Sequence, residues 1–362
     1  MLIHAECQIP DSVLQHHPTR PQSSHFSHEW SMPRAKLSLA VSLMMLILMV
    51  GCSPDPDSNS ATSASSASGG IGKQQAATVV VTSEFLEQAG QRLAGDEFNV
   101  RKIVPDSTTS PRWRPRRSDL EMMRSAELIV MSGAGYEPWK DRVSLPDSRV
   151  VDSSSGYRDQ LIRIPDAVTH QHGPEGKHSH AGFIAASWMD PDLAAAQLTA
   201  IEKAFTVIKP DLKPQFAREA SRFRTMLESF SRDLDSLKAR CDASKLMVAS
   251  DSPAVSYLVR RLGLELKYLH WETPETPTDN DRSELQNLVR QLPDRLPQRL
   301  FLLNSRCPDS AESWVTDSGF TVARIDLLDA PGIESTPAGS EWMDRFSLNL
   351  SRLKNAIESA SR

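Results

Sequence analysis

Hydrophobic residues recur at helical spacing through the middle of the chain, between Asp190 and Arg240. Asp190-Pro191 predicts a helix start, because a side-chain oxygen can cap the first free amides and proline lacks an N–H that would stay unpaired there. Two apolar stripes follow, separated by Pro210: Leu198, Ile201, Phe205 and Ile208, then Phe216, Phe223, Leu227, Phe230, Leu234 and Leu237. An unbroken helix from Pro214 to Arg240 would be about 40 Å long, enough to bridge two lobes.

Short apolar runs rich in β-branched residues alternate with amphipathic helices on both sides of this stretch. The runs that predict strands are 78–82, 98–104, 128–131, 246–249, 264–269, 299–304 and 320–325. Such alternation is typical of the α/β class. We predict two Rossmann-like lobes with parallel sheets, joined by a long rigid backbone helix that keeps hinge motion small. The lobes are expected over 76–189 and 241–362, with connecting helices over 190–240.

The segment 32–51 has the pattern of a secretory signal. Basic residues precede a short apolar run, 37–50, and a small residue follows it before Cys52. The run is short for a transmembrane span. A cysteine in this place resembles the lipobox of bacterial lipoproteins, in which that cysteine is lipidated; an uncleaved anchor with a structural cysteine is the alternative. Residues 1–31 precede a second methionine, Met32, and are interpreted as a misassigned leader.

The segment 52–75 is rich in serine, alanine, glycine and threonine. Such a composition buries too little apolar surface to offset its ordering entropy, so we expect a flexible tether between the lipid and the folded part. Export would place Cys241 and Cys307 in an oxidising compartment, where a disulfide between them is allowed but not required.

Composition excludes several classes of function. With 362 residues, of which 39% are hydrophobic, the chain can bury more than one core. The formal charge of −5 provides no general attraction for nucleic acid. The four cysteines lack the close pairing that zinc ribbons and dithiol centres need. No nucleophile and base stand together, so an enzyme is not expected.

The loops after the strands 98–104 and 128–131 should border a ligand crevice, because ligands bind beyond the carboxyl ends of parallel strands. The first loop carries several arginines, which either attract an anion or are simply solvated: Arg112, Arg114, Arg116 and Arg117. The second contains Gly133-Ala-Gly135, which lacks the third glycine and the later acidic residue of a dinucleotide site.

Four of the ten histidines lie within eleven residues of a Gly/Pro loop: His170, His172, His178 and His180. Neutral imidazoles suit zinc, and closely spaced pairs on a loop can wrap one ion. The alternative is a merely polar loop. The segment therefore predicts a contact with a metal ion.

His270 and Glu272 stand two residues apart at the end of a predicted strand. Residues at this spacing on extended chain point the same way, so we expect both to face the crevice as half of a divalent-ion site. A surface histidine paired with its neighbour is the alternative.

Several motifs together carry a family resemblance. They are Pro-x-Trp-Arg-Pro at 111–115, Ser-Gly-Ala-Gly-Tyr-Glu-Pro-Trp at 132–139, the histidine loop before Trp-x-Asp-Pro at 188–191, and His-Trp-Glu at 270–272. In this order they resemble the substrate-binding lipoproteins of bacterial ABC importers for zinc and manganese, over residues 76–360. The resemblance implies a periplasmic or extracytoplasmic protein, anchored through Cys52, that captures Zn²⁺, Mn²⁺ or another divalent ion between its lobes and delivers it to a membrane permease.

The chain departs from the family at the places of the usual ligands. Pro111-Arg112 replaces the first histidine, Ala186 the second and Ser252 the third, and Asn304 stands where an acidic ligand is often found. Asp251, beside Ser252, is either a ligand or, as we favour, a helix cap.

We therefore expect capture rather than catalysis by a monomer. The ion would lie near His270 and Glu272, with a cleft lined or closed by further side chains: Trp113, Arg114, Trp188, Trp271 and Asp251. The principal alternative is an interaction or anion-binding lipoprotein that kept the scaffold and lost the metal. A metal-dependent hydrolase is a third, for which the sequence offers no general base.

Overall fold

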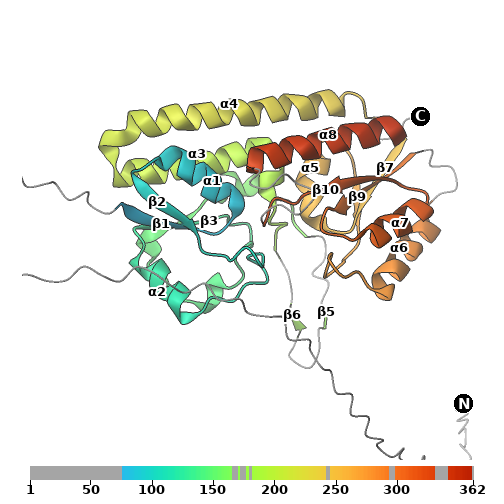
Figure 1. Ribbon diagram of the computed structural model, residues 1–362, viewed down its shortest axis with the longest axis horizontal. Coiled ribbons are helices and arrows are strands. Elements are labelled where there is room, and N and C mark those ends of the chain that lie inside the picture. Colours follow the sequence, from blue (N-terminus) through green and yellow to red (C-terminus); the bar gives the residue numbers. More distant parts are fainter. Residues whose placement is uncertain are drawn as a thin grey trace, which may run out of the picture. The chain divides into compact units, whose positions relative to one another are not determined.

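The computed structural model describes residues 76–164, 170–171, 177–178, 182–241, 245–292, 298–330 and 341–360. Two four-stranded sheets, each parallel throughout, define an N-terminal and a C-terminal lobe (Figure 1). The α/β class and the two-lobed architecture predicted from the sequence are confirmed.

The N-terminal sheet has the strand order β2-β1-β3-β4. Its elements are β1 (Ala77–Val81), α1 (Glu84–Ala94), β2 (Phe98–Lys102), α2 (Arg117–Ser125), β3 (Leu128–Met131) and β4 (Val150–Asp152). Helix α1 begins after Ser83, whose hydroxyl accepts from the Leu86 amide, and ends at Gly95, which has a φ of +53°. Local capping residues thus set both ends of the first crossover helix.

The C-terminal sheet has the strand order β10-β9-β7-β8. Its elements are β7 (Leu246–Ser250), α5 (Ser256–Arg261), β8 (Leu266–Tyr268), α6 (Asp279–Gln291), β9 (Gln298–Asn304), α7 (Asp309–Asp317), β10 (Thr321–Ile325) and α8 (Trp342–Ala360). Strands β7 and β9 are adjacent although β8 separates them in sequence. The chain therefore reverses its winding direction between β7 and β9.

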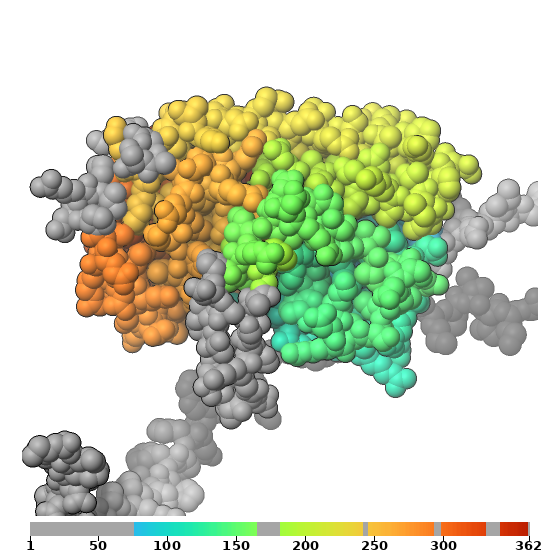
Figure 2. Space-filling model, turned by 180° about the vertical axis from the view of Figure 1, so that it is seen from behind, coloured from blue at the N-terminus to red at the C-terminus, as the bar shows by residue number. Residues whose placement is uncertain are grey.

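Helices α3 (Pro191–Ile208) and α4 (Lys213–Lys238) form the connection between the lobes. Asp190 caps α3 through a hydrogen bond from the Asp192 amide, and Pro191 is its first residue, as the sequence predicts. With 26 residues, α4 is about 39 Å long. It packs against α1 and α3 and also against α5 and α8 of the C-terminal lobe, so α4 runs over both lobes (Figures 1 and 2).

The largest hydrophobic core continues from one lobe to the other. It contains Val79 and Leu128 of the first sheet, Phe223 of α4, and Leu300 and Trp342 of the second lobe. Two smaller cores lie on the outer faces of the sheets. A shared core of this kind joins the lobes rigidly, since separating them would expose apolar surface at about 25 cal/mol per Å².

The remaining described elements are short. They are the 3-10 turns Lys140–Arg142, Asp147–Arg149, Ser155–Gln160, Ser187–Met189, Pro210–Leu212 and Pro253–Val255, and the two-residue strands β5 (His170–Gln171) and β6 (Lys177–His178). No helix within the described ranges is long and apolar enough to cross a membrane. The segments 1–31, 32–51 and 52–75, with Cys52, lie outside the described residues.

Cys241 and Cys307 are both free thiols. Cys241 packs against the shared core, whereas Cys307 is buried in the outer core of the C-terminal sheet. Burial raises the pKa of both thiols. The disulfide that the sequence allowed is absent from the structure.

Candidate functional site

A pocket of about 280 Å³ opens where loops of the two lobes meet. The N-terminal lobe contributes the loop after β2, and the C-terminal lobe contributes the loops after all four of its strands. The lining residues are Ser107, Thr108, Thr109, Pro111, Arg112, Ser252, Ala254, Trp271, Pro274, Glu275, Asn304, Arg306, Leu327, Asp329 and Ala330. Both switch-point strands, β7 and β9, deliver a lining residue just past their carboxyl ends. The crevice is therefore where the strand order predicts it.

Two arginines from opposite lobes line this pocket. Arg112 lies in the loop after β2 and donates from its guanidinium to the backbone carbonyl of Glu272 in the other lobe. Arg306 follows β9, and its Nη1 lies 3.7 Å from the Glu275 carboxylate. The pocket thus carries two fixed positive charges beside two carboxylates, those of Glu275 and Asp329.

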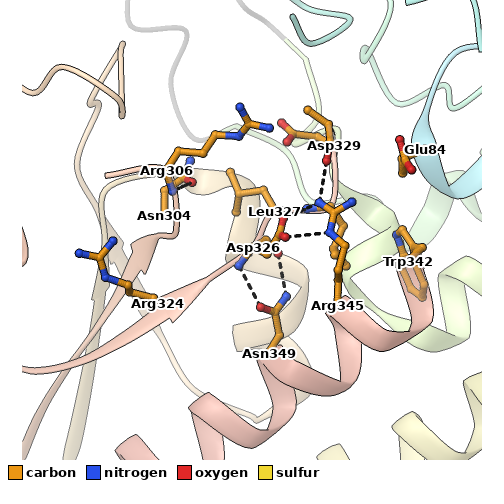
Figure 3. A network of polar contacts seen from close by, with 12 residues as sticks. Glu84, Asn304, Arg306, Arg324, Asp326, Leu327, Asp329, Trp342, Arg345 and Asn349 are labelled. Carbon is orange, nitrogen blue, oxygen red and sulfur yellow. Dashed lines mark hydrogen bonds and ion pairs between the residues drawn. The ribbon is translucent and has the colours of Figure 1, made fainter. Parts of the chain in front are cut away.

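Asp329 sits on a tightly held turn after β10 (Figure 3). Arg345 of α8 donates two 2.8 Å bonds to the Asp326 carboxylate and a 2.6 Å bond to the carbonyl of Ala330. Leu328 lies between them with a φ of +58°, a conformation that costs a non-glycine residue energy and persists only where the surroundings enforce it. The turn is therefore fixed at both ends by one buried guanidinium.

Residues of the N-terminal lobe also hold this turn. The Trp188 indole donates to the Leu327 carbonyl at 3.0 Å, and the Tyr136 hydroxyl donates to the Asp329 carbonyl at 3.4 Å. Burial raises the pKa of the Asp329 carboxyl, and the nearby Arg306 opposes that rise. In Figure 3 the Arg306 side chain extends toward Asp329. The carboxyl thus lies in the pocket wall with a guanidinium facing it.

The switch point of the N-terminal sheet holds a second buried carboxyl, Glu137. It accepts hydrogen bonds from the Thr82 hydroxyl at 2.6 Å, the Ser132 amide at 2.8 Å and the Gly133 amide at 3.1 Å. Burial raises the pKa of Glu137 to about 7, and these donors oppose the rise. Because these donors belong to residues at the ends of β1 and β3, Glu137 joins the two strands. It is not among the residues that line the pocket.

The backbone of the loop after β3 shows why Gly133-Ala-Gly135 contains two glycines. All three residues have positive φ, and a side chain on Gly133 would collide with the Asp152 carboxylate and the Ser154 hydroxyl. Asp152 and Ser154 instead meet each other, with the hydroxyl donating at 2.6 Å. Gly133 therefore permits a close approach of this loop to the end of β4.

Asp251 is buried at the end of β7 and fastens that strand to β9. Its Oδ1 accepts from the Asn304 amide at 2.7 Å, and within the described residues its Oδ2 has no partner. Burial raises the pKa of Asp251 to about 7. The helix cap that we favoured for it is instead Ser252, whose hydroxyl accepts from the Ala254 amide at 3.2 Å. Asp251 is not among the residues that line the pocket, whereas its neighbour Ser252 is.

Side chains of the segment 269–272 point alternately to two sides, as predicted. The side expected to face solvent is the buried one. Leu269 and Trp271 are buried, whereas His270 and Glu272 are exposed. Trp271 lines the pocket; His270 stacks edge-on against Tyr268, and its amide donates to the Glu284 carboxylate. The structure therefore puts His270 and Glu272 on the side of this segment away from the lining residue.

The other aromatic candidates are structural neighbours of the pocket. Trp113 is buried against Trp139, with ring centroids 5.2 Å apart, and Trp188 is buried against Tyr136 at the lobe junction. Arg114 is exposed and donates to the carbonyls of Pro111 and Trp113. Of the sequence-predicted cleft residues, the pocket brings in Trp271, and of the four loop arginines it brings in Arg112.

The described residues on either side of the histidine segment are held together at the lobe junction. The Ile164 amide donates to the Gly182 carbonyl, and the Tyr257 hydroxyl of the other lobe donates to the Ile184 carbonyl at 2.7 Å. The backbones of His170 and His178 pair across β5 and β6. His172 and His180 lie outside the described residues.

Sequence reasoning missed Arg306, Glu275 and Asp329. They come from three different loops and no local spacing links them, although Asp329 follows the last strand closely enough for the carboxyl-end rule to have singled it out. Among the residues that the structure describes, no group of three or more histidine, cysteine, aspartate or glutamate side chains is arranged to hold a metal ion. The pocket has one arginine that the sequence analysis did not name, Arg306, in addition to Arg112.

Named proteins of other organisms are similar to this chain in sequence. A "putative metal-binding protein" of Treponema pallidum (strain Nichols) is 28% identical over 193 residues, which cover 52% of this chain and 60% of the relative. The "zinc-binding lipoprotein AdcA" of Streptococcus pneumoniae (strain ATCC BAA-255 / R6) is 20% identical over 285 residues, 77% of this chain and 56% of the relative. The chain thus spans less than two thirds of both.

The fold matches solved structures as well. The "metal-dependent lipoprotein YcdH" of Bacillus subtilis superposes with a TM-score of 0.62 at 17% identity, over 77% of this chain and 99% of that one. A family model described as "Zinc-uptake complex component A periplasmic" matches residues 79–356, nearly the whole of both lobes. The chain belongs to this zinc-uptake component family.

Proposed function

We propose that the chain is the extracytoplasmic substrate-binding component of a metal ABC importer, which captures a divalent cation between its lobes and passes it to a membrane permease. Zinc is the favoured ion, with manganese or another divalent ion as alternatives. The observation that carries the proposal is the pocket built by loops of both lobes at the carboxyl ends of their strands, with the Asp329 carboxyl in its wall. Family membership and the names of the relatives support it.

The proposed ligand set combines Asp329 with imidazoles of the histidine segment. A carboxylate and neutral imidazoles suit zinc, and the root of that segment is held at the lobe junction by Tyr257. His270 and Glu272 remain ligands predicted from the sequence, and their exposed positions make them the alternative set. A protein of this type captures its cargo and needs no catalytic residue.

The lipid on Cys52 and the tether over 52–75 would hold the folded part near the membrane. The signal pattern over 32–51 supports this localisation. In this arrangement the chain acts as a monomer beside its permease.

Isothermal titration of the full chain with zinc sulfate and with manganese chloride tests the proposal. One zinc should bind per chain, and Asp329→Asn should weaken binding at least tenfold because it removes the carboxylate proposed as a ligand. Replacing the four segment histidines by glutamine should also weaken it. Loss of binding in His270→Ala with full binding in Asp329→Asn would move the site to the exposed pair, and no uptake of either ion would overturn bare-cation capture.

A second candidate function has an observation in its favour. Arg112 and Arg306 line the pocket and favour an anion over a cation, in keeping with an anion-binding lipoprotein on the same scaffold. Binding of an anion by the full chain, without binding of zinc or manganese, would support this alternative.

A further inference from the structure

The pocket is large for a bare ion. Its volume of about 280 Å³ compares with roughly 30 Å³ for one water molecule in the liquid, and it approaches the roughly 300–1,000 Å³ of small-molecule sites. A single cation at Asp329 would leave most of this space to solvent. The dimensions therefore suit an organic molecule with several polar groups.

The polar groups of the lining are of two kinds. The guanidiniums of Arg112 and Arg306, with the hydroxyls of Ser107, Thr108, Thr109 and Ser252, are donors suited to carboxylate oxygens. The carboxyls of Glu275 and Asp329 are acceptors suited to a cation. A bare divalent ion would face two guanidiniums, and a bare anion would face two carboxyls. An occupant that combines a cation with an anion would meet both kinds of group.

The two guanidiniums are placed to act from opposite sides. Arg112 belongs to the N-terminal lobe and reaches across to the Glu272 carbonyl. Arg306 belongs to the C-terminal lobe, with Glu275 at 3.7 Å and its side chain extended toward Asp329 (Figure 3). A polycarboxylate between them would be held by one charge from each lobe, and a metal that it carries would meet Asp329.

We infer that this pocket binds a divalent cation as its complex with a small polycarboxylate, held by Arg112 and Arg306. The inference rests on the proposed function and specifies the chemical form of its substrate. Planar guanidiniums recognise carboxylates through paired hydrogen bonds, whereas lysine offers only a point charge, so the fork geometry matters here.

Citrate serves as the probe in a three-arm titration of the full chain with zinc sulfate alone, sodium citrate alone and their one-to-one complex. The complex should bind at least tenfold more tightly than either component. Arg112→Gln and Arg306→Gln should each weaken binding of the complex at least tenfold, and Arg306→Lys should recover only part of the loss. Arg117→Gln is the matched control, because Arg117 is exposed and pairs with Glu121 on its own helix.

Each other result overturns the inference in a distinguishable way. If zinc alone binds and citrate merely competes for it, bare-cation capture stands and the chelate is rejected. If citrate binds equally with and without zinc, the site is a plain anion site. If no arm binds while thermal melting shows every variant folded, both proposals fall.

Discussion

The guanidinium of Arg345 donates two hydrogen bonds to the Asp326 carboxylate, from Nε to Oδ2 and from Nη2 to Oδ1, each 2.8 Å long (Figure 3). Both side chains are nearly inaccessible to solvent, with 1% and 11% of their areas exposed. A bidentate pair in this environment fixes the loop that carries Asp329. Because Leu327, Asp329 and Ala330 of this loop line the pocket, the pair links the stability of α8 to the geometry of the binding site.

Arg345→Met should destabilise the protein by about 3–5 kcal/mol, because it leaves the buried Asp326 carboxylate unpaired. Urea unfolding followed by circular dichroism measures this loss. Lys354→Met on the same helix is the control: Lys354 is exposed, so its substitution should change the free energy of unfolding by less than about 0.5 kcal/mol. Equal effects of the two substitutions would contradict the assigned role.

Asp251→Asn should make the protein more stable in alkaline solution. Burial raises the pKa of Asp251 from 3.8 to about 7 in the folded state, so its favourable contribution is complete below pH 3.8 and is lost as the pH rises through about 7. Asparagine keeps the acceptor for the Asn304 amide without the buried charge. At pH 8 the variant should gain on the order of 1–3 kcal/mol over the parent.

The advantage of Asp251→Asn should shrink as the pH falls from 8 to 4, because the parent carboxyl then becomes neutral. Denaturant midpoints at pH 4, 6 and 8 give the trend directly. An advantage that is constant with pH would show that Asp251 does not titrate in this range.

Glu137→Gln should be destabilising by about 1–3 kcal/mol, since an amide nitrogen would replace an oxygen that accepts from the Ser132 or Gly133 amide. Thermal unfolding measures the change. Glu121→Gln on the exposed face of α2 is the matched control and should leave the melting temperature nearly unchanged. A melting temperature that is the same in Glu137→Gln and the parent would refute the strand-joining role of this carboxyl.

Gly133→Ala should prevent normal folding or lower stability by several kcal/mol. Its φ of +74° disfavours a side chain, and the added methyl group would collide with Asp152 and Ser154. Gly156→Ala, where no atom lies within 4 Å of the new methyl group, should be close to neutral. Soluble yield and melting temperature of the two variants, compared side by side, check the prediction.

Elements with strong local signals could be predicted from the sequence. Strand β3 was predicted as 128–131, where the structure has it, and α3 begins at its expected proline. Strand β4 was missed because its three residues are only partly buried, and α6 because its sequence is mostly polar and only Asp281 and Leu285 are buried. Helix α6 nonetheless has a local start signal, the capping box formed by Thr278 and Asp281.

The candidate site was harder to predict because it depends on which face of a segment meets the rest of the protein. Alternation alone could not decide whether His270 and Glu272 or Leu269 and Trp271 face inward; packing of Trp271 near Phe301 decided it. Arg306 and Asp329 meet through the order of β9 and β10 in the sheet, which the linear sequence does not contain.

Helix α4 and the shared core have a consequence for how a transporter would recognise the loaded state. Because α4 and the shared core join the lobes, we expect ligand binding to cause only a small change in their relative positions. Arg112 and Arg306 line the pocket beside the carboxyls of Glu275 and Asp329, and a bound metal–polycarboxylate complex would change the net charge there. We therefore expect a docking partner to distinguish the ligand-bound protein from the ligand-free protein by surface potential. The difference in its affinity for the two forms should decrease as ionic strength rises.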